Sequence, residues 1–225
     1  MPERLLVAAD AVAVAVLRRS AAGVTPLAQV QLSGQSPADL LEATGLALES
    51  TAGEGGHADV WLGSSWARLL AIDWPAVALD RAESAALLAH AWTAVIGDTA
   101  GWRLLVAERG SPRLGVALPE MVVIGLAEQL RQRRVAAHSL LPAICGALQR
   151  RPQAGATAVL DEGDRVSIAV CDERGDVRAI SSRRRRPEED IRVSAAETAG
   201  SGRLVCLPMG VGAEPACVRW GGLWA

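Results

Sequence analysis

The sequence predicts an α/β protein in which two similar β-β-β-α-β units flank an inserted α/β segment. Two observations support this prediction: three short strand-like stretches, a helix and a fourth strand occur near the start of the chain, and the same order returns near its end. The segment between them has a different composition. We therefore expect a first unit over residues 1–65, an inserted subdomain over 66–152 and a second unit over 153–225.

The first unit begins with two apolar, strand-like stretches. Its four strands are expected over residues 4–10, 11–19, 27–32 and 59–62. Ser36 and Pro37 are residue types that favour the first turn of a helix, which we expect to end near residue 51. This order of elements defines the unit that the sequence repeats.

The inserted segment alternates strands and helices. Strands are expected over 67–74, 102–107, 114–118 and 135–139, and helices over 81–96, 119–134 and 141–150. Asp80 is placed to cap the first of these helices. Its apolar positions at helical spacing are Ala85, Leu88, Trp92 and Val95. A Pro- and Gly-containing linker over 152–155 then marks the start of the second unit.

The second unit is predicted from strict alternation of apolar and polar residues. Val166, Ile168 and Val170 alternate with polar or small residues, between a turn over 161–164 and a second turn over 173–176. A third strand is expected over 177–182, a helix over 187–199 and a last strand over 203–209. This repeats the β-β-β-α-β order of the first unit, and we infer that the chain arose by duplication.

Composition excludes several kinds of chemistry. The chain contains no Lys, so it has no phosphate-binding lysine and no Schiff-base lysine. Its net charge of −2 does not provide the basic surface that nucleic acid binding requires. The 4 Cys residues lack C-x-x-C spacing, and the three His residues lack the spacing of a zinc site, so we expect reduced thiols and no metal site. Neither a signal peptide nor a membrane-spanning stretch is expected, which favours a cytoplasmic location.

The order of elements and several local motifs together resemble the actin-like ATPase superfamily. Within that superfamily the chain is similar to the cytoplasmic actin-like subunits of bacterial secretion and pilus platforms, the type II secretion L protein and the type IV pilus assembly M protein. The motifs that carry the resemblance are Ile72-Asp73-Trp74-Pro75, Glu83 early in a helix, the connection from Gly97 to Trp102, Ala117-Leu118-Pro119-Glu120, and Leu141-Pro142. The resemblance implies an actin-like (RNase H-like) fold built from duplicated units with an inserted subdomain.

Active members of the superfamily carry an Asp-x-Gly phosphate loop after the first strand of each unit, and these loops suggest where ATP and Mg²⁺ would bind. Asp161-Glu162-Gly163 retains this pattern, whereas Asp10-Ala11-Val12 has no glycine. We interpret Asp10, Asp161 and Gly163 as ordinary turn residues and expect a degenerate ATPase without bound cofactor. The alternative is a working ATP-binding protein in which these three residues bind the nucleotide.

Arg183, Arg184, Arg185 and Arg186 form the densest charge run in the chain. We interpret it as a solvated strand end, relieved by the acidic residues that follow. The alternative is a contact with an acidic partner or with the anionic inner leaflet of the membrane. The segment Gly63-Ser64-Ser65 is interpreted as an ordinary loop, because it lacks the G-x-S-x-G pattern of a nucleophile turn.

The resemblance implies a scaffold subunit at the cytoplasmic face of the inner membrane, in a type II secretion or type IV pilus platform. It would bind the cytoplasmic segment of an inner-membrane partner or the secretion ATPase, and would reach the membrane through partners. An ATP-gated assembly role, a homodimer, and a domain cut from a longer L-type protein stay open as alternatives.

Overall fold

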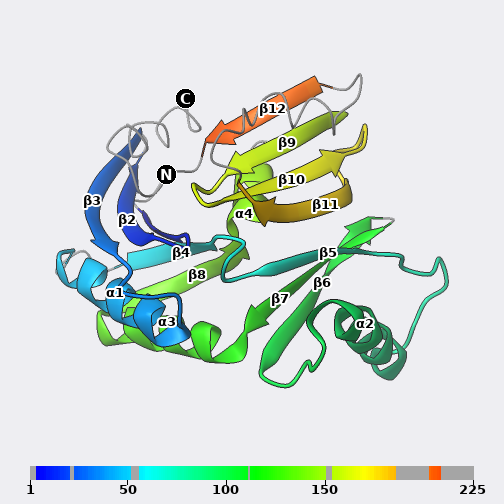
Figure 1. Ribbon diagram of the computed structural model, residues 1–225, viewed down its shortest axis with the longest axis horizontal. Helices are drawn as coiled ribbons and strands as arrows, with labels where there is room; N and C mark the ends of the chain where they lie inside the picture. Colours follow the sequence, from blue (N-terminus) through cyan, green and yellow to red (C-terminus); the bar gives the residue numbers. More distant parts are fainter. Residues whose placement is uncertain are drawn as a thin grey trace.

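The computed structural model describes residues 4–20, 23–51, 56–110, 112–150, 154–185 and 203–208, which form three β-sheets and four α-helices (Figure 1). The predicted helix over 187–199 lies outside the described residues. None of the described helices is both long and apolar enough to cross a membrane.

The first sheet has five strands in the order β3-β2-β1-β4-β8. These strands are β1 (Arg4–Ala9), β2 (Ala13–Ser20), β3 (Gly23–Gln31), β4 (Gly56–Leu62) and β8 (Val135–Pro142). β1, β2 and β3 pair antiparallel, whereas β4 pairs parallel to both β1 and β8. The predicted β-β-β-α-β order of the first unit is therefore present, with β8 added at the edge.

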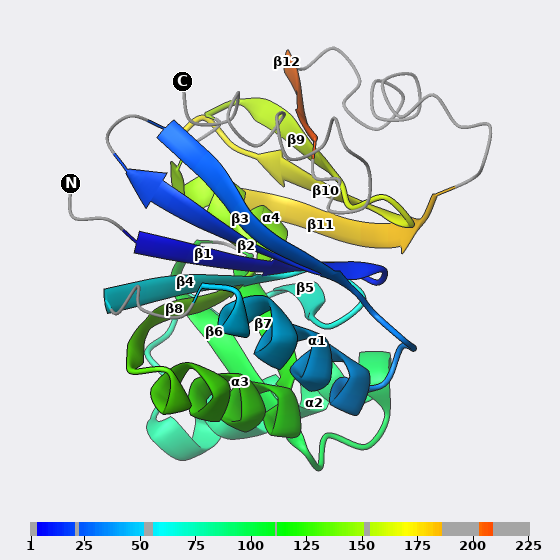
Figure 2. The same ribbon diagram turned by 90° about the vertical axis from the view of Figure 1, so that its left-hand side faces the viewer.

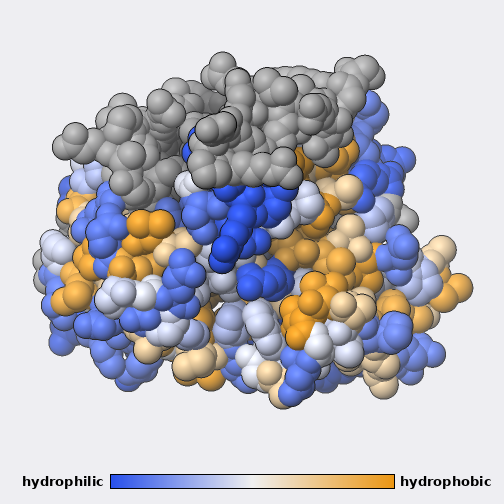
Figure 3. Space-filling view, viewed as in Figure 1, coloured by the Kyte–Doolittle hydropathy of each residue, from blue (hydrophilic) through white to orange (hydrophobic). Residues whose placement is uncertain are grey.

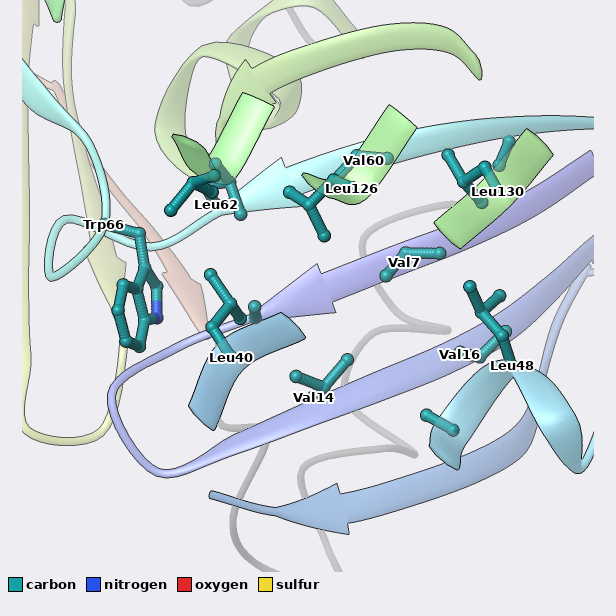
Figure 4. Close-up of a cluster of buried hydrophobic side chains, with 14 of the residues drawn as sticks. Val7, Val14, Val16, Leu40, Leu48, Val60, Leu62, Trp66, Leu126 and Leu130 are labelled. Carbon is teal, nitrogen blue, oxygen red and sulfur yellow. The ribbon is translucent and has the colours of Figure 1, made fainter. Parts of the chain in front are cut away.

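Two helices, α1 (Pro37–Glu49) and α3 (Glu120–Gln132), cover one face of the first sheet (Figure 2). α1 begins with a capping box in which the Ser36 side chain accepts from the Asp39 N–H and the Asp39 carboxylate accepts from the Ser36 N–H. Branched side chains of the sheet meet leucines of both helices in the core between these layers (Figure 4). They include Val7, Val14, Val16, Val60, Leu40, Leu48, Leu126 and Leu130. We call the first sheet with α1 and α3 the first lobe.

The second sheet has the strand order β11-β10-β9-β12, which matches the order β3-β2-β1-β4 of the first sheet. Its strands are β9 (Ala156–Asp161), β10 (Arg165–Cys171), β11 (Val177–Arg184) and β12 (Arg203–Pro208). β12 pairs parallel to β9, as β4 does to β1. The matching order agrees with the inferred duplication, and we call this sheet the second lobe.

The short helix α4 (Ala143–Arg150) lies between the two lobes (Figure 1). Its Ile144 joins Leu6, Trp61 and Leu160 in a buried cluster that links the first sheet, the helix and the second sheet. Gly146 of α4 is packed so tightly against the indole of Trp61 that a Cβ at this position would overlap the ring. The lobes are therefore joined by a continuous apolar core.

The third sheet, in the order β5-β7-β6, stands beside the two lobes. It consists of β5 (Arg68–Ile72), β6 (Trp102–Gly110) and β7 (Arg113–Pro119), with α2 (Arg81–Ile96) packed on β6. Residues 66–152, expected to form one inserted subdomain, contribute to two sheets, because β8 pairs with β4 and α3 covers the first sheet. The domain boundaries at 65/66 and 152/153 stay predictions.

Several local expectations differ from the structure. β3 begins at Gly23 and not at residue 27, and β4 begins at Gly56 and not at residue 59. Of the predicted apolar face of α2, only Trp92 is buried, whereas Val95 is 49% exposed, because α2 covers little more than the strand β6. α3 ends at Gln132, before Arg134 adopts a left-handed φ of 57°. Leu141 and Pro142 belong to β8, so α4 begins at Ala143.

Candidate interlobe site

The polar segments that follow three strands meet where the two lobes face each other. Because β1 and β4 are parallel, with Ala9 opposite Leu62, the Asp10 turn and the Gly63-Ser64 turn emerge at the same sheet edge. The β9–β10 turn of the second lobe reaches this edge through Glu162. We call the group formed by Asp10, Gly63, Ser64, Glu162 and Arg165 the interlobe site.

Asp10 closes the β1–β2 turn. Its carboxylate Oδ1 accepts hydrogen bonds from the backbone N–H of Val12 at 2.7 Å and of Ala13 at 2.8 Å. Its carbonyl oxygen accepts from the indole Nε1 of Trp66 at 2.5 Å. The side chain is buried, with 2% of the residue exposed. The backbone donors of this turn are therefore directed at a side chain of the turn itself.

Asp161 has the same role in the β9–β10 turn. Its Oδ1 accepts from the N–H of Gly163 at 3.0 Å, and its Oδ2 lies 3.2 Å from Nη1 of Arg185. Gly163 has a φ of 83°, and a Cβ there would meet nothing within 4 Å. Glycine is therefore favoured by the backbone conformation of the turn and not by the close approach of another group.

Glu162, between these two residues, bridges the lobes. Its Oε2 accepts from both the backbone N–H and the hydroxyl of Ser64, at 2.7 and 2.5 Å, and its Oε1 accepts from the hydroxyl of Ser167 at 2.9 Å. Only 2% of Glu162 is exposed. The absence of a side chain at Gly63 leaves room for Glu162 to reach Ser64. A Cβ at Gly63 would lie 3.0 Å from the carbonyl oxygen of Ala9 and 3.4 Å from Oε2 of Glu162.

Two arginines donate hydrogen bonds to Ser64. Nε of Arg165 donates to the Ser64 hydroxyl oxygen at 3.1 Å, and Nη1 of Arg68 donates to the Ser64 carbonyl oxygen at 2.7 Å. Burial raises the pKa of Glu162, against the opposing effect of its hydrogen bonds from Ser64 and Ser167 and of the nearby Arg165 charge. Burial, and secondarily the Arg165 charge, lowers the pKa of Arg68. Side chains from both lobes thus form one largely buried network of hydrogen bonds at this site.

The interlobe site does not fit the phosphates of a nucleotide. A phosphate loop offers free backbone N–H groups, but here those of Val12, Ala13 and Gly163 donate to Asp10 and Asp161. The carboxyl group of Glu162 also lies between the two lobes, where it accepts hydrogen bonds from Ser64. Within the described residues, no three His, Cys, Asp or Glu side chains lie close enough together to hold a metal ion.

Arg185, directly after β11, contacts the Asp161 turn. Arg185 pairs with Asp161, and its backbone N–H donates to the carbonyl oxygen of Asp164 at 2.8 Å. Arg184 and Arg185 line an open pocket of about 610 Å³ beside the turn, whereas Arg186 lies outside the described residues. The structure therefore brings Arg184 and Arg185 next to Asp161 and Gly163, two groups of residues that the sequence analysis treated separately.

Sequence reasoning missed the three residues that join the lobes. Ser64 was interpreted as part of an ordinary loop, Glu162 as the variable residue of an Asp-x-Gly pattern, and Arg165 only as an alternating polar position. One signal was present: Arg165 and Ser167 both lie on the polar side of the alternating β10 pattern. That pattern predicts a strand, but it does not predict that its polar face is buried against another lobe.

Comparison with known proteins supports the fold. No family model and no curated protein matches the sequence. The cytoplasmic domain of EpsL, an inner membrane component of the type II secretion system of Vibrio cholerae, has a TM-score of 0.63 and 16% identity, over 98% of this chain and 93% of that chain. A Bacteroides thetaiotaomicron protein of unknown function with an actin-like ATPase fold has a TM-score of 0.61 and 10% identity, over 94% of this chain and 83% of that chain.

The PilM-PilN type IV pilus biogenesis complex is a third similar structure, with a TM-score of 0.55 and 17% identity, over 80% of this chain and 60% of that chain. The first two structures cover nearly the whole chain and include both lobes. The actin-like fold that the resemblance implied is confirmed: this chain is an α/β protein with the actin-like ATPase fold.

Proposed function

We propose that this protein is a scaffold subunit at the cytoplasmic face of a bacterial inner membrane, in a type II secretion or type IV pilus assembly platform. It binds the cytoplasmic segment of an inner-membrane platform protein and does not hydrolyse ATP. The secretion ATPase is a second partner under this proposal. Fold similarity to the EpsL cytoplasmic domain and to the PilM-PilN complex supports the platform role by analogy.

The observation that carries the non-hydrolysing part of the proposal is the Glu162 bridge. In this chain a buried carboxylate from one lobe is bonded to the backbone and hydroxyl of Ser64 on the other lobe. The two lobes are held together by groups of the chain itself, and the turn N–H groups are already used. Such a fold does not need a nucleotide to hold its lobes in place.

A thermal-shift titration with Mg-ATP and Mg-ADP tests this part. The proposal predicts no saturable rise in melting temperature at millimolar nucleotide. A ligand that binds only the folded state would stabilise it by about 2.7 kcal/mol at a hundredfold excess over its dissociation constant. A saturable rise that Asp161→Ala abolishes would favour a nucleotide-gated protein instead. Asp172→Ala is the matched control, because Asp172 caps the next turn by accepting from the N–H groups of Arg174 and Asp176.

The scaffold role is tested with peptides. Synthetic cytoplasmic segments of the inner-membrane platform proteins encoded in the same genome are titrated against the full chain by calorimetry. Saturable binding of one segment, and not of its scrambled version, is expected. If none of the segments binds at millimolar concentration, the partner part of the proposal is wrong.

A further inference from the structure

The open pocket beside the interlobe site is lined from both lobes. Gln35, which precedes α1 in the first lobe, faces Gly163 and Asp164 of the β9–β10 turn and Arg184 and Arg185 at the end of β11. The pocket has a volume of about 610 Å³, which suits a small ligand or a short peptide segment. Figure 3 shows strongly hydrophilic surface in the middle of the molecule, where Figure 1 places the end of β11 and the start of β5.

The two arginines that line this pocket differ in how they are paired: Arg185 forms an ion pair with Asp161, whereas Arg184 does not form one with any described residue. Arg165 and Arg184 lie directly opposite each other on β10 and β11, and like charges in that relation destabilise a sheet. Arg165 is turned toward the hydroxyls of Ser64 and Ser182. The Arg184 side chain is exposed and has no hydrogen bond or ion pair with any described residue. An anionic group beside Arg184 would relieve this repulsion.

The other side chains that line this pocket are Arg185, Asp164 and Gln35. Arg185 is already paired with Asp161, at 3.2 Å. Asp164 is half-buried and its Oδ1 has no hydrogen-bond partner among the described residues. Burial of the carboxyl raises the pKa of Asp164, against the opposing effect of the nearby Arg165 and Arg184 charges. Gln35 adds an exposed amide that can donate or accept. The pocket therefore offers the exposed guanidinium of Arg184, with the Gln35 amide and the half-buried Asp164 carboxyl beside it.

We propose that this pocket binds the carboxylate side chain of an acidic peptide segment, with Arg184 as the residue that pairs with it. A guanidinium binds a carboxylate with two parallel hydrogen bonds, which suits a single exposed arginine at the wall of a pocket. We favour a peptide over a membrane surface, because the pocket is lined by residues of both lobes and adds the uncharged amide of Gln35 to the arginine. The proposal rests on the proposed function, since it names the chemistry of the partner segment.

The test measures binding of a blocked, fluorescein-labelled peptide, Gly-Ser-Glu-Glu-Ser-Gly, to the full chain by anisotropy at low salt. The same peptide with glutamine in place of both glutamates is the ligand control. Arg184→Gln is expected to weaken binding by about tenfold. Arg178→Gln is the matched variant, because it removes the same charge from the other end of β11, where Arg178 pairs with Asp172 at 2.8 Å. It is expected to leave the affinity unchanged.

Three outcomes would overturn the inference: equal affinity of the wild-type chain and the Arg184 variant, equal weakening by both variants, or equal binding of the acidic and the neutral peptide. Binding of vesicles containing phosphatidylglycerol that depends on Arg184, without binding of the acidic peptide, would also overturn it in favour of a membrane contact.

The same variant separates this inference from the proposed function. If a platform segment binds the wild-type chain and the Arg184 variant equally well, the scaffold role stands and the pocket assignment fails. If the acidic peptide binds through Arg184 but no platform segment binds, the pocket stands and the platform role fails.

Discussion

Removal of the Glu162 carboxylate is expected to loosen the junction between the lobes. Glu162→Ala leaves three donors without their acceptor, the N–H and hydroxyl of Ser64 and the hydroxyl of Ser167. Each unsatisfied buried donor costs about 1 to 3 kcal/mol, and relief of the buried carboxylate offsets part of the sum. We expect a net loss of about 3 kcal/mol in the free energy of unfolding, which lowers the melting temperature by roughly 6 to 12 °C.

The assay is urea unfolding followed by circular dichroism and by tryptophan fluorescence. Glu42→Ala is the control, because Glu42 is exposed on α1 and its loss is expected to change stability by about 0.5 kcal/mol or less. If Glu162→Ala costs no more than this control, the bridge does not stabilise the junction and the reasoning is refuted. Non-coincident transitions of the two probes in the variant would indicate that one lobe unfolds before the other.

Three further predictions concern pH, packing and thiol reactivity. Burial raises the Glu162 pKa above its ordinary value of 4.5, so the folded state binds more protons than the unfolded state. The stability of the wild-type chain relative to Glu162→Gln, measured by urea unfolding, should therefore fall as pH rises above about 4.5, and a constant difference would contradict this. Gly146→Ala should destabilise the fold by about 2 kcal/mol in the same urea assay, because the added Cβ would overlap with Trp61. Gly45→Ala, also within a helix, is the control and should not destabilise the fold, because its Cβ would meet only the flexible end of Gln129 at 3.2 Å. Burial raises the pKa of Cys145 to about 12. Alkylation of this thiol by iodoacetamide, followed by mass spectrometry, should therefore be at least about a hundredfold slower in the folded chain than in urea. Equal rates would contradict the burial of Cys145.

The strands and helices were predictable because local pattern decides them. The alternation in β10 and the turns around it are present as expected, and the capping residues Ser36 and Asp80 begin α1 and α2. The turn roles expected for Asp10 and Asp161 also agree with the structure, because each side chain accepts hydrogen bonds from its own turn. These features depend on residues within a few positions of one another in the sequence.

The long-range features could not be predicted from the same signals. The bond between Ser64 and Glu162 joins residues 98 positions apart, and nothing near either residue marks it. Burial of a glutamate in a turn between two strands also runs against the usual exposure of charged residues. The place of β8 beside β4 depends on how the chain returns after α3, which composition and periodicity do not determine.

Within the described residues, the chain passes from the first lobe to the second once, after α4. The described residues before 151 form the first and third sheets with all four described helices, and the described residues 154–185 and 203–208 form the second sheet. A cut between residues 153 and 154 would therefore sever a single connection and leave the strands of every sheet intact. The protein is suited to reconstitution from two separately expressed fragments. Their association constant would report the contacts that the second sheet makes with the rest of the chain, among them the buried cluster around Ile144, the Glu162 bridge and the contact of β11 with β5.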